Sequence, residues 1–133
     1  MKKLASILVM ALIIAITSCK KQAGAGGSST IKGNVWAQKW NSTYTSMSGE
    51  GPAKDINVYI IYGDEISYGD KIATSPDGTF EFTYLRTGKY KIFVYSKTSV
   101  TPTNPNGKIE VSADAEITKK KQIVDAGKFT VNI

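Results

Sequence analysis

Beyond residue 30 the apolar side chains recur at every second position, and short turn-forming segments separate the apolar stretches. Phe80 and Phe82 flank a glutamate, and Tyr90, Ile92 and Val94 resume the alternation after a turn. Side chains at every second position of a strand face the same side, so one face of each strand would be buried. After the first 18 residues no segment of helical length has apolar side chains at a 3.6-residue period. The pattern therefore predicts an all-β fold.

Turn-forming residues divide this pattern into short strands. Pro76 and Gly78 favour a tight turn, because proline presets φ and glycine accepts a positive φ, and Gly88 marks the next reversal. Residues 37–54 form a long connection rich in Ser, Thr and Gly. Seven short strands with such punctuation predict a single sandwich. The expected strands are residues 31–36, 56–62, 71–74, 80–82, 90–95, 108–118 and 122–133.

The first residues have the composition of an export signal. Lys2 and Lys3 precede an apolar stretch at residues 4–16, which is interrupted only by Ser6. At 1.5 Å per residue such a stretch would cover roughly 20 Å as a helix, less than the roughly 30 Å hydrocarbon core of a bilayer. The stretch is thus typical of the apolar region of a signal peptide and too short for a permanent transmembrane helix.

The stretch ends in Ile16-Thr17-Ser18-Cys19, which resembles the lipobox of bacterial lipoproteins. The resemblance implies that residues 1–18 are removed and that Cys19 carries the lipid. Residues 19–30, rich in Gly, Ala and Ser, would form a flexible tether, and residues 31–133 the domain. We therefore expect a lipid-anchored protein of the cell envelope, in the outer membrane. No acidic run follows Cys19, which favours a position facing the periplasm.

Four further motifs resemble the carboxypeptidase regulatory-like domain. They are IKGNV at residues 31–35, INV at residues 56–58, IATSPDGTFEF at residues 72–82 and LRTGKYKI at residues 85–92. That family has a prealbumin-like sandwich, which it shares with the B-type repeats of collagen adhesins. The resemblance implies this fold and an extracytoplasmic setting. It implies no reaction, because such domains are mostly accessory modules.

The composition argues against catalysis and against several partners. The chain has no histidine, which removes the usual general base and the commonest metal ligand, and Cys19 is its one cysteine. Asp64, Glu65 and Asp70 share a loop, but their spacing matches no calcium-binding pattern. The net charge is +6. Its one dense tract, residues 119–121, is expected to be a turn and lacks the interleaved aromatics of a nucleic-acid site. We predict no enzyme activity, metal, cofactor or nucleic-acid partner.

The resemblance to adhesins raises one covalent possibility. Relatives of that kind can join a lysine of the first strand to an Asn or Asp of the last strand, with help from a buried acid. Lys32 and Asp125 occupy those two strands, but Val94 stands where the acid is needed. We therefore predict that no isopeptide bond forms.

The candidate interaction site comes from two strands that are apolar on both faces. If Val58, Ile60, Ile92 and Val94 point inward, the four side chains between and beside them point outward. A prealbumin-like fold would make these strands neighbours and would gather the four side chains into one patch. The alternative is that residues 36–51 fold over this face and bury it. The four outward residues are Tyr59, Ile61, Phe93 and Tyr95.

These observations predict a non-catalytic module that binds an envelope protein or a second copy of the chain. The alternative is a carbohydrate-binding accessory lipoprotein in which exposed Trp36, Trp40 and Tyr44 stack on sugar rings. A third possibility is a structural spacer without a ligand. A flat apolar sheet face would favour a protein partner, and exposed coplanar indoles would favour a sugar.

Overall fold

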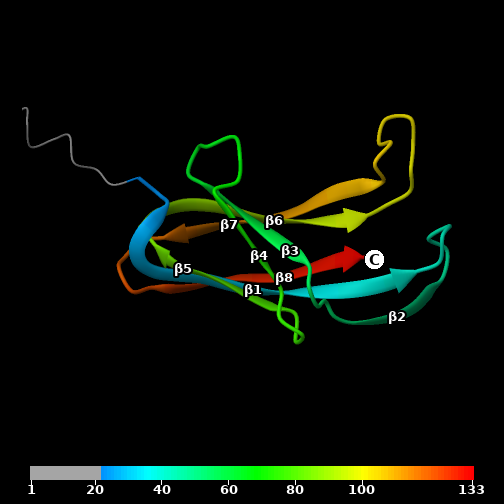
Figure 1. The fold of residues 1–133 in the computed structure, drawn as a ribbon, viewed down its shortest axis with the longest axis horizontal. Coiled ribbons are helices and arrows are strands. Elements are labelled where there is room, and N and C mark those ends of the chain that lie inside the picture. The colour runs from blue at the N-terminus through cyan, green and yellow to red at the C-terminus, as the bar shows by residue number, and fades with distance from the viewer. Residues whose placement is uncertain (1–21) are drawn as a thin grey trace, which may run out of the picture.

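The structure, a computed structural model, describes residues 22–133, so Cys19 and the predicted signal peptide lie outside the described residues. The described residues form an all-β fold of two four-stranded sheets (Figure 1). The strands are β1 (Ala25–Trp40), β2 (Met47–Pro52), β3 (Asn57–Tyr62), β4 (Asp70–Ala73), β5 (Thr79–Leu85), β6 (Gly88–Lys97), β7 (Lys108–Ile117) and β8 (Ile123–Asn132).

Strand β1 organises one sheet, which we call the β1 sheet. One edge of β1 pairs antiparallel with β5 along its first part and with β2 along its last part. The other edge pairs in parallel with β8, from Thr30 opposite Ile123 to Gln38 opposite Asn132. Strand β1 therefore carries the backbone pairing of the whole sheet.

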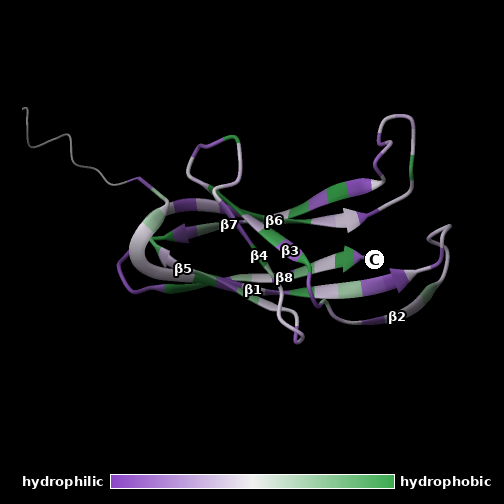
Figure 2. Cartoon of the chain, in the orientation of Figure 1, coloured by the Kyte–Doolittle hydropathy of each residue, from purple (hydrophilic) through white to green (hydrophobic). Residues whose placement is uncertain are grey.

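The second sheet, which we call the β6 sheet, has the order β4-β3-β6-β7 and is antiparallel throughout. Its central strands β3 and β6 pair with Tyr59 opposite Phe93. Apolar and polar residues alternate along its edge strand β7, as the green and purple bands show in Figure 2, so one face of β7 meets the core and the other meets solvent. The central strands β3 and β6 carry large apolar side chains on both faces.

The core lies between the two sheets and contains the side chains that the sequence pattern predicts. Phe80 and Phe82 are each 3% exposed, while Ile92 and Val94 are completely buried. Phe80 contacts both Phe82 and Phe129, with ring centroids 6.0 and 5.9 Å apart. The predicted all-β sandwich and its strand phase are therefore confirmed. The other large core residues are Ile31, Val35, Val58, Ile60, Leu85, Tyr90, Ile117 and Val131.

The structure contains eight strands, so the prediction of seven was one short. The additional strand is β2, which lies inside the predicted connection and forms a hairpin with the end of β1. Almost all of its side chains are exposed, so β2 has no alternating apolar pattern. Its backbone pairs with β1 whatever its side chains are, which is why the pattern did not reveal it.

Strand β1 begins at Ala25, six residues before the predicted start, so the expected flexible tether is wrong for residues 25–30. Ala25 and Ser29 both pair with Leu85 across a register shift. The Ser29 hydroxyl is buried, donates to the Lys119 carbonyl and accepts from the Gln122 amide. These hydrogen bonds hold a Gly/Ser-rich segment that has too few apolar side chains to indicate a strand.

A hydrogen-bonded clamp fixes the chain just before β1. The Gly24 amide donates to the Tyr90 hydroxyl over 2.9 Å, and the Arg86 amide donates to the Gly24 carbonyl over 2.8 Å. The Tyr90 hydroxyl donates in turn to the Arg86 carbonyl over 2.6 Å. Ala23 packs on Gly88 so closely that a Cβ on Gly88 would lie 2.6 Å from the Ala23 Cβ. The domain therefore holds its N-terminal segment from residue 23 onward.

The core assignment predicts the effect of one truncation. Phe82→Ala should lower the free energy of unfolding by about 3–5 kcal/mol, because it removes a buried ring and leaves a cavity. Thermal unfolding measures the loss, and Glu81→Ala on the exposed side of the same strand is the control. A fall in melting temperature of about 1–2 °C for Phe82→Ala would contradict this account, because each kcal/mol is worth about 4–8 °C in a domain of similar size.

Candidate functional site: an aromatic face on the β6 sheet

The candidate site is built by the alternation of side chains on β3 and β6. Val58 and Ile60 are completely buried in the core, so Tyr59 between them faces outward. On β6, Ile92 and Val94 are buried in the same way and Phe93 faces outward between them. The antiparallel register then places Tyr59 directly beside Phe93.

Four aromatic rings contact one another on this surface. Tyr59 stacks on Phe93 with centroids 4.9 Å apart and planes 11° from parallel. Tyr95 meets both rings edge-on, at 5.7 Å from Tyr59 and 5.6 Å from Phe93. Tyr68 meets the other side of Tyr59 edge-on at 4.9 Å. We call this cluster of Tyr59, Tyr68, Phe93 and Tyr95 the aromatic face.

The aromatic face is partly open to solvent. Phe93, in contact with the Tyr59 and Tyr95 rings, is only 5% exposed, whereas Tyr68 and Tyr95 are 49% and 48% exposed. Ile66, in the same β3–β4 loop as Tyr68, is 98% exposed. The cluster therefore presents tyrosine rings at its surface and holds a phenylalanine beneath them.

The alternative prediction, that residues 36–51 fold over the aromatic face, is wrong. Residues 36–51 belong to the β1–β2 hairpin of the other sheet. Tyr68 provides the cover from the β3–β4 loop, where the sequence showed only an isolated tyrosine among acidic residues. The one signal in the sequence for this role of Tyr68 was that it is an aromatic residue close in the chain to Tyr59, which was predicted to face outward. Its position depends on the loop conformation, which has no periodic pattern.

Ile61 lies beside the aromatic face and not in it. It is half-buried and faces Lys91 across the strand pair. The Lys91 ammonium pairs with the Glu110 carboxylate over 2.6 Å, and this ion pair raises the pKa of Lys91. In the register of β6 and β7, Lys91 lies opposite Asp114 and Glu110 lies opposite Tyr95. The pair formed by Phe93 and Ser112 lies between these two pairs. A charged border thus runs along one side of the aromatic face.

The three candidate sugar-stacking residues do not form a common platform. Trp36 lies on the outer face of the β1 sheet, where its indole donates to Glu50 and the Lys128 ammonium lies 4.3 Å from the ring centre. The indole nitrogen of Trp40 is buried, with no hydrogen-bond partner in the described part of the chain. Tyr44 lies in the β1–β2 turn with a φ of 55°. Of the three, only Trp36 has a cation over its ring among the residues that the structure describes.

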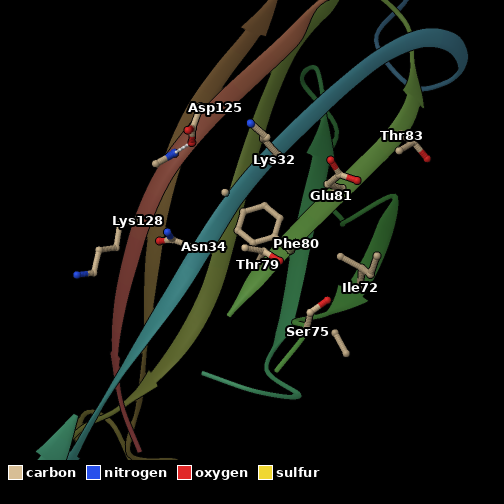
Figure 3. Close-up of a pocket in the computed structure, with 13 residues that line it drawn as sticks. Lys32, Asn34, Ile72, Ser75, Thr79, Phe80, Glu81, Thr83, Asp125 and Lys128 are labelled. Atoms are coloured by element: carbon tan, nitrogen blue, oxygen red, sulfur yellow. Dashed lines mark hydrogen bonds between the residues drawn. The ribbon is translucent and has the colours of Figure 1, made fainter. Parts of the chain in front are cut away.

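Beside Trp36 an open groove of about 880 Å³ extends from the outer face of the β1 sheet around strand β5 (Figure 3). Lys32, Glu81 and Asp125 lie on the same side of the sheet, and the Phe80 ring borders the groove at the strand edge. Asp125 accepts a hydrogen bond from the Gly127 amide. The lining is therefore mostly polar and contains both signs of charge.

Across residues 22–133, no three His, Cys, Asp or Glu side chains are grouped so that they could hold a metal ion. The same residues contain no helix long and apolar enough to cross a membrane.

Comparisons with known proteins place the chain in no family. No protein-family profile matches it, and no curated protein sequence does. Among solved structures, it is similar to a Pseudomonas aeruginosa protein described as "a putative carbohydrate binding protein". The sequence identity is 11%, the match covers 87% of this chain and 93% of that chain, and the TM-score is 0.46. The resemblance to carboxypeptidase regulatory-like domains stays a prediction.

The groove bears on the covalent possibility raised by the sequence. Lys32 and Asp125 are direct neighbours across β1 and β8, on the outer face of the β1 sheet. Val94, at the expected position of the assisting acid, is completely buried in the β6 sheet. The amine and the carboxylate are thus exposed and have no buried acid beside them. Amide formation would need such an acid to transfer protons, so it is not favoured.

We accordingly expect the intact mass of the purified protein to show no loss of water. Mass spectrometry of the wild type checks this, with Lys32→Ala as the matched variant. A wild-type mass lower by one water, restored to the full value in Lys32→Ala, would show that the bond forms.

Proposed function

We propose that the chain is a lipid-anchored, non-catalytic module of the bacterial envelope whose aromatic face binds a protein partner. The observation that carries the proposal is the contact of four aromatic side chains on one sheet face, two of them about half exposed. The export signal and lipobox pattern at residues 1–19 support the anchor.

The geometry of the aromatic face suits protein recognition. Tyrosine provides a large contact area at low cost in side-chain entropy and is enriched among interface hot spots. The Lys91–Glu110 ion pair beside the aromatic face would serve as a polar rim. A lipid anchor adds to this, because confinement at a membrane raises the effective concentration of a partner on the same membrane. These features support an envelope protein as the partner.

Carbohydrate binding is the second candidate, and the polar groove beside Trp36 is the observation that favours it. Asn34, Glu81 and Asp125 supply donors and acceptors of the kind that sugar hydroxyls need. Against it, the Trp36 ring already carries the Lys128 ammonium, and the Trp40 indole nitrogen is buried. The aromatic face is therefore the better supported site.

The first prediction of this proposal concerns the lipid anchor. Cys19→Ser should abolish lipidation, and any processed protein should leave the membrane fraction, since stable attachment requires at least two acyl chains. Fractionation with mass spectrometry of the mature N-terminus measures both effects. An unmodified Cys19 in the native mature protein would disprove the anchor.

The aromatic face makes the second prediction. Tyr68→Ser and Tyr95→Ser should leave the melting temperature within a few degrees of wild type, because both side chains are about half exposed. Each should weaken partner binding by about 2 kcal/mol or more if it is a hot spot. Cross-linking in the native envelope would identify the partner, and titration of the purified pair would measure the affinity.

Two further variants serve as comparisons for the tyrosine variants. Phe93→Ser removes a buried ring, so it should destabilise the domain as well and cannot separate folding from binding. Trp36→Ala on the opposite sheet should leave protein binding unchanged while weakening any sugar binding. Unaltered cross-links in both tyrosine variants would exclude the aromatic face as the interface. Cross-links between two copies of the chain would identify self-association.

A further inference from the structure

The clamp at Gly24 leaves a short connection to the proposed lipid anchor. The domain holds Ala23 and Gly24 through the contacts with Gly88, Arg86 and Tyr90 described above. Five residue steps separate Gly24 from Cys19, and an extended chain covers at most about 3.6 Å per residue, or about 18 Å in all. The end of the domain that carries Gly24 must therefore stay near any membrane that holds Cys19.

That end of the domain carries a concentration of positive charge. The β7–β8 turn contains Lys119, Lys120 and Lys121, all exposed. Its backbone is joined to the first part of β1, because the Lys121 amide donates to the Ser28 hydroxyl and the Lys119 carbonyl accepts from Ser29. Figure 1 shows this turn beside the start of β1 and the β5–β6 turn, at one end of the sandwich. We call Arg86, Lys119, Lys120 and Lys121 the basic end.

A small pocket of about 320 Å³ lies within the basic end. Arg86, Thr87 and Lys120 line it together with the Gly/Ser segment at residues 26–29. The Arg86 Nε atom is buried, and residues 22–133 offer it no hydrogen-bond partner. Arg86 as a whole is only half-buried, and its guanidinium is particularly suited to phosphate oxygens.

The neighbouring charges are mixed. Asp64, Glu65 and Lys89 line an adjacent groove next to Ala23. None of these three lines the pocket of Arg86 and Lys120. Lys20 and Lys21, which lie outside the described residues, add two more positive charges between Cys19 and the clamp. Glu116, opposite Lys89, is a third acid of this end. Arg86, Lys89 and the three lysines of the turn outnumber the three acids, so positive charge predominates there.

We propose that the basic end is a docking surface for anionic lipid headgroups of the membrane that holds Cys19. The inference rests on the proposed lipid anchor and adds an orientation to it. The short connection brings the lysines to the surface, and the surface potential of anionic lipids attracts basic groups within about 10 Å. Docked in this way, the domain would point its β1–β2 hairpin away from the bilayer.

The test uses the acylated full-length protein in vesicles of neutral phosphatidylcholine, with or without anionic phosphatidylglycerol. A donor dye is placed by Thr87→Cys at the basic end or by Ser42→Cys in the β1–β2 turn, and an acceptor dye is carried on lipid headgroups. Lipidation blocks the native Cys19, so only the introduced cysteine is labelled. Flotation and intact mass first establish that Cys19 is acylated.

In anionic vesicles we expect strong energy transfer from residue 87 and weak transfer from residue 42. The variant Lys119→Gln/Lys120→Gln/Lys121→Gln should lower the docked-to-undocked ratio on the order of 100-fold, because each lysine near an anionic surface contributes about fivefold to it. The matched control, Lys39→Gln/Lys97→Gln/Lys108→Gln, removes three exposed lysines outside the basic end and should keep the difference. High salt should act like the first variant.

Equal transfer from residues 87 and 42 in anionic vesicles would overturn the docking surface while the anchor stood. A difference that survives in neutral vesicles and in the first variant would also overturn it, because the short connection alone would then explain the orientation. A protein that does not float and has an unmodified Cys19 would overturn the anchor, and the docking surface with it.

Discussion

The backbone pairing of β1 is the constraint on which the rest of the structure depends. This one strand meets β5 and β2 along one edge and β8 along the other. The first and last strands run in parallel, so both begin at the basic end and both run toward the β1–β2 turn. This arrangement places the lysines of the β7–β8 turn beside the start of β1, and Lys32 beside Asp125. In both cases the residues that become neighbours are far apart in the sequence.

The two outer faces of the sandwich differ in chemistry because their strands differ in what lies between the core residues. On β1 and β5 the residues that alternate with the core are mostly polar or charged, such as Lys32 and Glu81. On β3 and β6 they include Tyr59, Phe93 and Tyr95. A polar outer face is stable in water by itself. An aromatic one leaves less apolar area exposed to water when the rings cover one another or when another protein covers them, and this stabilises it.

The clamp at Gly24 would set the orientation of the two outer sheet faces relative to the membrane. If the chain is held at Cys19, the strands run away from the bilayer and both sheet faces stand roughly upright on it. The aromatic face would then be presented sideways to other proteins of the same membrane. A long flexible tether would have allowed any orientation. In the proposed function, the clamp therefore decides which surface of the domain neighbouring membrane proteins can reach.

The sequence by itself determined the all-β class, the phase of the core strands and the outward direction of Tyr59 and Phe93. It could do so because burial on one face imposes a period of two that is visible in the residues. Tertiary structure alone decided the strand at residues 47–52, the early start of β1 and the position of Tyr68 over Tyr59. Each of these depends on backbone hydrogen bonds or on a loop conformation, and neither leaves a periodic pattern in the side chains. The closeness of Gly24 to Tyr90 belongs to the same class, because a tyrosine hydroxyl and a glycine amide 66 residues apart meet only when both sheets have formed.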